Sequence, residues 1–240
     1  MTTLLDVKDL TLEFKTERGT LKALNGISFN VRTREIFGLV GETGCGKTVT
    51  GLSILRLLPR SARITNGEIV FSSKNLLTVP DKEMEAIRGN DIAMIFQDPS
   101  SSLNPVFTVG SQMERVLRQH KGMNSKGANE RAAQMLTAVG LPDVNRMLAA
   151  YPHQLSGGQQ QRVMIAMALS CEPRLLIADE PTTALDVTIQ AQILHLLRDL
   201  QTQFDFSVIL ITHNLGVVAQ TCDRLAVLYA GRVAEIGSTD

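Results

Sequence analysis

Eight consecutive residues have the spacing of a phosphate-binding loop: Gly41-Glu42-Thr43-Gly44-Cys45-Gly46-Lys47-Thr48. Glycines in the form G-x-x-x-x-G-K-[ST] let backbone N–H groups point into one concavity, and a helix that begins there adds the positive end of its dipole. Lys47 would then reach the β- and γ-phosphates, and the Thr48 hydroxyl would bind Mg²⁺. The pattern predicts a site for a nucleoside triphosphate. A chance match in a glycine-rich turn is the alternative.

The segments on both sides of this loop fit the prediction. Ile36, Phe37, Leu39 and Val40 form a short apolar run typical of a buried strand. From Val49 onward, apolar residues recur at helical spacing as far as Pro59, a helix stop. A strand, a glycine-rich turn and a helix form the context in which this pattern binds phosphate.

Two carboxylates, Asp179 and Glu180, end another apolar run, residues 175–178. Open α/β sheets bind ligands at the carboxyl ends of their strands, so both side chains are expected at that edge. Asp179 is suited to hold Mg²⁺ through its water shell. Glu180 is suited to orient and deprotonate an attacking water. An acidic turn after a core strand is the alternative, and these residues alone do not separate the two interpretations.

A second anion site is predicted where a helix begins after Leu155, at Ser156, Gly157, Gly158 and Gln159. Free N–H groups and the helix dipole favour an anion at such a position. A plain N-cap by Ser156 is the alternative. One nucleotide needs only one phosphate loop, so a second anion site in the same chain requires an explanation.

Composition excludes several classes of protein. Lys plus Arg (24) equals Asp plus Glu (24), so the chain lacks the basic character that is usual for nucleic-acid binding. The three cysteines lie far apart, which favours neither a disulfide framework nor a zinc site. No apolar run approaches the roughly 18 residues of a membrane span, and the N-terminus is no signal peptide. We expect a soluble cytoplasmic domain, so any membrane role must come through partners.

The hydrophobic pattern predicts an α/β fold. Residues 7–31 alternate with a period of two, which indicates antiparallel strands with one wet face. From Ile36 onward, short apolar strands alternate with helices, as in a parallel sheet. Residues 99–154 show no convincing strand and are expected to form helices at 109–120, 128–139 and 144–150. The end of the chain, 225–228 and 233–236, is expected to form a hairpin.

Taken in order, these motifs resemble the ATP-binding cassette (ABC) ATPases over essentially the whole chain. Residues 155–159 resemble the family's signature, and Gln97 in Phe96-Gln97-Asp98-Pro99 resembles the Q-loop. Ala184-Leu185-Asp186 resembles the D-loop, and His213 resembles the switch histidine. Phe14 stands where the family places the aromatic ring that stacks on adenine. Each has a simpler alternative: Phe14 and His213 as core residues, and Gln97 as a surface turn residue.

The resemblance implies one ABC ATPase domain over residues 1–240. It has a P-loop NTPase core with a mixed sheet and an N-terminal antiparallel β subdomain, at about 1–98 and 155–240. An α-helical subdomain is implied at about 99–154. It implies ATP hydrolysis between two subunits arranged head to tail.

The resemblance also implies a role for each motif residue. Lys47, Gln97, Glu180 and His213 would be catalytic, with Glu180 as general base. Thr48, Gln97 and Asp179 would serve Mg²⁺. ATP would be held by residues that include those of the partner's signature: Phe14, Gly41, Glu42, Thr43, Gly44, Cys45, Gly46, Lys47, Thr48, Val49, Ser156, Gly157, Gly158, Gln159 and Asp186.

Residues 178–194 and 96–109 resemble the oligopeptide/dipeptide importer branch, which also includes importers of nickel complexes and glutathione. The implied partners are a second ATPase subunit, identical or paralogous, two transmembrane permeases and an extracytoplasmic solute-binding protein, at the cytoplasmic face of the inner membrane. Departures are Asn214, where the branch usually has Asp, and Arg34, where a turn glycine is common. Many peptide-importer ATPases continue beyond the position of Asp240, so we expect a truncated or a short member.

Two functions from other classes remain open. The first is a soluble ABC ATPase that acts on nucleic acid or ribosomes. It would be expected to carry a coiled-coil insertion, cysteine pairs, a second cassette or a basic surface, and the sequence has none of these. The second is a P-loop enzyme that phosphorylates a small molecule, which would leave Gln97 and residues 156–159 without a purpose.

Overall fold

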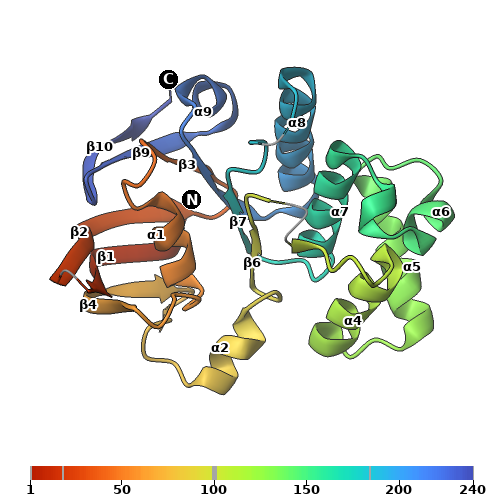
Figure 1. Cartoon of the computed structure of the whole chain (residues 1–240), viewed down its shortest axis with the longest axis horizontal. Helices are drawn as coiled ribbons and strands as arrows, with labels where there is room; N and C mark the ends of the chain where they lie inside the picture. The colour runs from red at the N-terminus through yellow and green to blue at the C-terminus, as the bar shows by residue number, and fades with distance from the viewer. Residues whose placement is uncertain (1, 18, 99–101, 184, 240) are drawn as a thin grey trace. The chain divides into compact units, whose positions relative to one another are not determined.

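The computed structural model describes residues 2–17, 19–98, 102–183 and 185–239 (Figure 1). The chain divides into two compact units. The first unit comprises residues 1–85 and 207–240, and the second comprises residues 86–206. The predicted division into a core and a helical subdomain at 99–154 stays a prediction.

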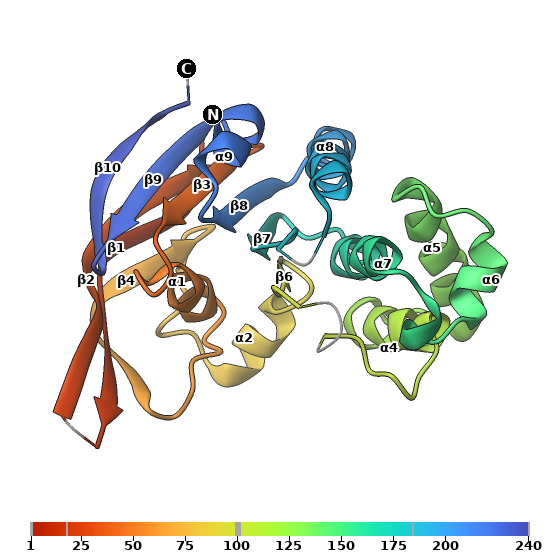
Figure 2. The same cartoon turned by 45° about the horizontal axis from the view of Figure 1, so that its top comes forward.

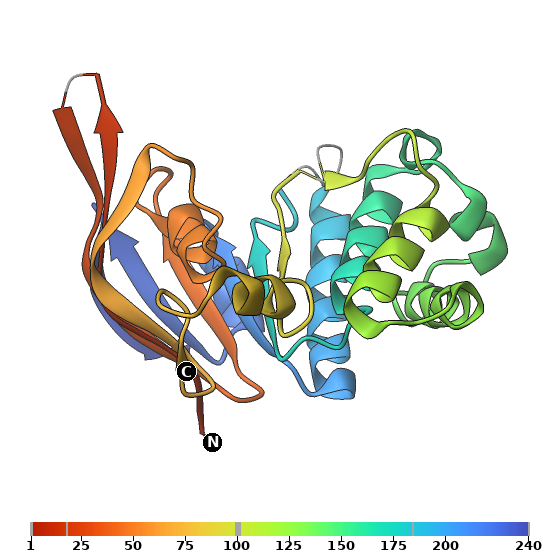
Figure 3. The ribbon, with the colours of Figure 1, turned by 90° about the horizontal axis from the view of Figure 1, so that it is seen from below.

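An antiparallel sheet forms much of the first unit. Its order is β2-β1-β4-β5, and the strands are β1 (Thr3–Thr16), β2 (Gly19–Arg32), β4 (Ala62–Phe71) and β5 (Lys74–Asn75). Figure 3 shows the long hairpin of β1 and β2 extending past the other strands of this unit. Two alternating pairs of β1, Leu5 with Val7 and Leu10 with Leu12, are fully buried. A register shift between Val7 and Leu10 carries Asp9 at φ 46, and it explains why the alternation changes phase there.

The other strands of the first unit surround β3 (Ile36–Gly41), which leads into the phosphate loop. β3 pairs in parallel with β8 (Ser207–Thr212) and β9 (Arg224–Tyr229), and β9 pairs antiparallel with β10 (Arg232–Ser238). Residues 36–40 and the whole of β8 are buried, as expected for parallel strands covered on both faces. The predicted C-terminal hairpin is present.

Two helices of the first unit differ from the sequence-based expectation. Helix α1 (Lys47–Ile54) ends before Pro59, because Arg56 has left-handed backbone geometry at φ 51 and the helix cannot continue through it. Helix α9 (Leu215–Thr221) was not predicted. It has seven residues and starts where the Asn214 side chain accepts the N–H of Val217, so it is too short for a clear helical period.

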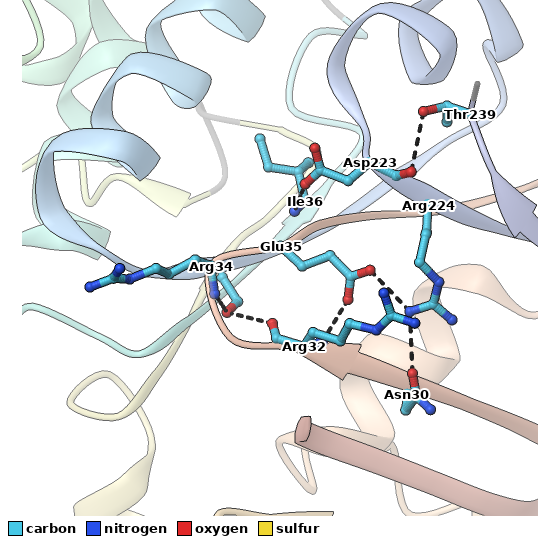
Figure 4. A network of polar contacts seen from close by, with 9 residues as sticks. Asn30, Arg32, Arg34, Glu35, Ile36, Asp223, Arg224 and Thr239 are labelled. Carbon is cyan, nitrogen blue, oxygen red and sulfur yellow. Dashed lines mark hydrogen bonds and ion pairs between the residues drawn. The ribbon is translucent and has the colours of Figure 1, made fainter. Parts of the chain in front are cut away.

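A buried polar network joins the start of β3 to the start of β9 (Figure 4). Glu35 is only 2% exposed; its side chain accepts the Arg32 N–H at 2.6 Å and pairs with Arg224 at 3.0 Å. Asp223 and Ile36 exchange two hydrogen bonds, both 2.8 Å long. Buried charges are tolerated when they are paired and hydrogen-bonded, so this network fixes the base of β3.

The second unit contains a parallel pair of strands, β6 (Ile92–Ile95) and β7 (Leu175–Asp179). Figure 2 shows its helices α4, α5, α6 and α7 gathered together. The helices with their bounds are α4 (Val109–Lys121), α5 (Ser125–Ala138), α6 (Val144–Ala149), α7 (Gly157–Leu169) and α8 (Val187–Phe204). α2 (Asp81–Ile87) bridges the residue ranges of the two units, and η1 (Pro152–Gln154) is a 3₁₀ turn.

The helices expected within 99–154 are present, with shifted ends. α5 begins three residues earlier than expected, because the Asn124 side chain accepts the Gly127 N–H and caps the helix ahead of its first apolar residue. In the described part of the chain, no helix has the length and apolar character needed to span a bilayer.

Candidate nucleotide site

The loop between β3 and α1 has the backbone shape that phosphate binding requires. Gly41, Gly44 and Gly46 have φ of 153, 82 and 112, values that favour glycine. A Cβ on Gly41 would lie 2.2 Å from the Leu228 oxygen, and one on Gly46 would lie 2.5 Å from Leu24. A Cβ on Gly44 would meet nothing within 4 Å, so conformation rather than crowding selects glycine there.

Lys47 reaches back over this loop. Its side chain is buried, and Nζ donates to the carbonyl oxygens of Gly41 and Glu42, each at 2.8 Å. Thr43 and Thr48 are exposed. The ammonium group is therefore held inside the loop by neutral acceptors, and a phosphate oxygen would be a stronger, charged acceptor at the same place.

His213 lies at the same cavity as the phosphate loop. A cavity of about 390 Å³ in the first unit is lined by Gly41, Glu42 and Thr43 together with His213 and Leu215. Strand β8 positions His213, because β8 pairs with β3 and both strands end at this edge. The core-histidine alternative requires burial, but His213 is exposed.

The unusual Asn214 next to His213 has a structural role. Its side chain accepts the Val217 N–H at 3.3 Å and caps α9. Asn and Asp are about equally good N-caps, so this departure from the branch's usual residue preserves the start of α9.

Phe14 lies on β1 directly across from Leu21 on one side and Ala62 on the other. Its side chain is half-buried, unlike those of Leu10 and Leu12, which are fully buried. Phe14 is therefore not a fully buried core residue. Its role as an adenine platform stays a prediction.

In the second unit, Gln97 and Glu180 are in contact although 83 residues separate them. Gln97 Nε2 donates to Glu180 Oε2 at 3.1 Å. The register of β6 and β7 causes this meeting: Ile95 pairs with Ala178, and each polar residue follows two positions later. Asp179, at the end of β7, is 3% exposed. Parallel pairing thus brings three predicted site residues to one sheet edge.

Sequence reasoning missed Thr183. Its hydroxyl donates to the same Glu180 Oε2 at 2.8 Å, and its N–H donates to the Glu180 carbonyl at 3.3 Å. Glu180 itself has φ 44, so a tight turn with a strained residue follows β7. The available signal was the spacing: a hydroxyl three residues after a carboxylate in a turn can bond back to it.

Ser156 and Gln159 form a capping box at the start of α7. Ser156 Oγ accepts the Gln159 N–H at 3.4 Å, and Gln159 Oε1 accepts the Ser156 N–H at 3.0 Å. The N-cap interpretation therefore describes what these side chains do in this structure. An anion role in a second chain is a separate prediction, because it concerns a partner.

The start of α7 lies next to the residues that follow β7. A Cβ on Gly157 would lie 3.5 Å from Leu185, and one on Gly158 would lie 3.2 Å from Ile189. Asp186 is exposed and is the N-cap residue of α8. The second unit therefore brings the signature and the D-loop together. Ala184 of the D-loop and Pro99 of the Q-loop lie outside the described residues.

The chain is similar to known proteins over most of its length. The model of the ABC transporter family matches residues 24–183. The dipeptide transport ATP-binding protein DppD of Bacillus subtilis (strain 168) is 56% identical over 239 residues, 99% of this chain and 71% of that protein. The oligopeptide transport ATP-binding protein OppD of Salmonella typhimurium is 49% identical over 234 residues, 98% of this chain and 70% of that protein.

Solved structures of ATP-binding cassettes are also similar to this chain. The dimeric post-hydrolysis state of the ATP-binding cassette MJ0796, bound to ADP and Pi, matches with a TM-score of 0.87 at 29% identity, over 98% of this chain and 99% of that chain. CbiO1 from Clostridium perfringens, part of an ABC transporter complex, matches with a TM-score of 0.84 at 27% identity, over 100% and 90%. The predicted fold class and family are confirmed: the chain belongs to the ABC transporter family, as one of its ATP-binding cassette ATPases.

Proposed function

We propose that this chain is the ATP-hydrolysing subunit of a membrane importer for dipeptides or oligopeptides. The observation that carries the substrate class is the 56% identity, over 99% of this chain, to a protein named for dipeptide transport. Nickel complexes and glutathione are the other candidate solutes. The observation that carries the chemistry is the contact between Gln97 and Glu180 at the end of β7.

In this proposal each predicted site residue has one task in ATP hydrolysis. Phe14 stacks on adenine, and the 41–48 loop holds the phosphates. The Lys47 ammonium group then donates to phosphate oxygens instead of to the loop carbonyls. Glu180 accepts a proton from the attacking water, and His213 stabilises the γ-phosphate. Phosphoryl transfer depends mostly on such positioning and charge neutralisation.

The residues proposed for Mg²⁺ suit its coordination chemistry. Mg²⁺ keeps several waters and takes few protein oxygens. Thr48 offers a hydroxyl and Asp179 a carboxylate. Gln97 uses its nitrogen toward Glu180, so its oxygen is the atom that would face a metal. No cluster of three or more His, Cys, Asp or Glu residues that could hold a metal occurs among the described residues, which fits an ion bound mainly by phosphate and water.

We propose that two such subunits close head to tail, so that Ser156 and Gly158 of one chain complete the phosphate site of the other. Two similar solved structures are of a dimeric cassette, which supports the formation of a dimer. The capping box leaves Ser156 and Gly157 exposed at the start of α7, where a second chain could reach them.

We propose that permease subunits receive the motion through the segment after β6. A mainly apolar cavity of about 240 Å³ in the second unit is lined by Phe96, Ser102, Leu103, His120, Met164 and Met167. Phe96 directly precedes Gln97 and is 41% exposed. A permease segment bound in this cavity would respond to a change in the position of Gln97. The solute-binding protein and the cytoplasmic face of the inner membrane belong to the same proposal.

The substitution Ser156→Arg tests the shared site. It places a bulky cation where the partner's phosphate would lie, so ATP hydrolysis should be lost while the monomer still binds ATP. Loss of ATP binding by the isolated monomer would contradict action in trans.

The substrate class is tested by purifying this subunit from membranes with its partners and reconstituting the complex in liposomes. ATP-driven uptake of labelled dipeptides or oligopeptides is expected. Uptake of a nickel complex or of glutathione without peptide uptake would reassign the substrate.

A further inference from the structure

The turn between β9 and β10 lies against the phosphate loop. The Gly231 N–H donates to the Cys45 carbonyl oxygen at 3.1 Å, and the Gly231 oxygen accepts the N–H of Asn25 on β2 at 2.8 Å. This turn is more than 180 residues from the loop in sequence, and none of the recognised nucleotide motifs includes it. Gly231 therefore links β2, the phosphate loop and the C-terminal hairpin.

Close packing at this junction selects glycine. Gly231 has φ 74, and a Cβ on it would lie 2.5 Å from the Ala23 oxygen. On the other side of the contact, a Cβ on Gly41 would lie 2.2 Å from the Leu228 oxygen. The backbones of β9 and the phosphate loop thus approach each other with no room for side chains.

Strand β9 holds β3 along its whole length. The pairing runs from Phe37 with Arg224 to Gly41 with Leu228. At the amino end of β3, the Asp223 carboxylate accepts the Ile36 N–H at 2.8 Å, as Figure 4 shows. Beyond the carboxyl end of β3, the Gly231 N–H of the turn donates to the Cys45 carbonyl oxygen. The strand that carries the phosphate loop is therefore held at both ends by the same neighbour.

The bond to Cys45 has a consequence for the loop's donors. A peptide unit is planar and trans, so its C=O and N–H point in opposite directions. The carbonyl of Cys45 points toward Gly231. The N–H of Gly46, in the same peptide unit, therefore points away from the hairpin.

We propose that Gly231 is a positioning residue for nucleotide binding: through the Cys45 carbonyl it orients the Gly46 N–H toward the phosphates. This inference rests on the proposed role of the 41–48 loop as the phosphate site. It concerns binding rather than chemistry, because the hydrogen bonds of Gly231 go to the phosphate loop and to Asn25.

The test compares Gly231→Ala with Gly237→Ala in the full chain. Both glycines lie near or within β10, but a Cβ on Gly237 would meet nothing within 4 Å. We expect Gly231→Ala to raise the Kd for MgATP at least about tenfold, because a hydrogen bond to a charged group is misdirected. KM for ATP should rise with it, kcat at saturating ATP should stay within about threefold of wild type, and Gly237→Ala should match wild type.

A purely structural role predicts a different result. In that case Gly231→Ala would lower the melting temperature but leave the Kd unchanged at temperatures where the variant is folded, and the inference would be overturned. If the variant does not fold, hydrogen exchange on the wild type decides: the Gly231 N–H should be protected without nucleotide, and rapid exchange refutes the bond. Failure of the wild type and Gly237→Ala to bind MgATP would instead refute the proposed function.

Discussion

Replacing Glu180 by Gln separates base catalysis from ATP binding. The Glu180 side chain accepts hydrogen bonds from Gln97 Nε2 and from the Thr183 hydroxyl, both at Oε2. A glutamine amide oxygen can accept both bonds in the same place. The substitution therefore preserves the local geometry and removes the basicity that deprotonates water.

The size of the effect follows from the loss of a general base. Such a group contributes about 10²–10⁴ in rate, so kcat should fall by that factor. At about 1.36 kcal/mol per tenfold change, the barrier rises by roughly 2.7–5.4 kcal/mol. The Kd for MgATP should change by less than about threefold, because Glu180 is not among the residues expected to hold ATP and the phosphate loop keeps its donors.

Phosphate release at steady state gives kcat, titration with nucleotide gives Kd, and size-exclusion chromatography with ATP reports the dimer that should accumulate when hydrolysis is blocked. Glu130→Gln on α5 is the matched control, since this exposed carboxylate lies outside the site. Hydrolysis near the wild-type rate by Glu180→Gln would refute the assignment of Glu180 as the base.

Three further predictions follow from contacts in the two units. Thr183→Val should lower kcat about tenfold with little change in KM while Thr183→Ser retains activity, because Ser keeps the hydroxyl that donates to Glu180 and Val does not; equal loss in both variants would refute this role. Arg224→Met leaves the buried Glu35 carboxylate unpaired and should cost about 3–5 kcal/mol in the free energy of unfolding, measured by urea denaturation; a loss below about 1 kcal/mol would contradict the importance of this pair. Burial raises the pKa of the Cys171 thiol. The stabilisation from this buried neutral thiol is therefore fully present below the pKa of the unfolded state and is lost as pH rises through the pKa of the folded state. A pH-independent difference in the free energy of unfolding between wild type and Cys171→Ala would contradict this prediction.

Local signals in the sequence were sufficient for the elements that hold the site. The phosphate loop, the apolar runs around it and the helix start at Ser156 each depend on residues within one or two turns of chain. Steric limits on glycine and the side-chain caps of helices act over that range. Where local evidence was weak, as at the short helix α9 or the left-handed Arg56, the boundaries were missed or misplaced.

Contacts between distant residues were decided by the tertiary structure. Gln97 meets Glu180 only because β6 and β7 pair in one register, and Gly231 reaches Cys45 only because β9 lies beside β3. Strand order and register depend on the whole set of packed faces rather than on any single segment. The sequence by itself predicted which groups bind phosphate; the tertiary structure decided which distant residues lie against those groups.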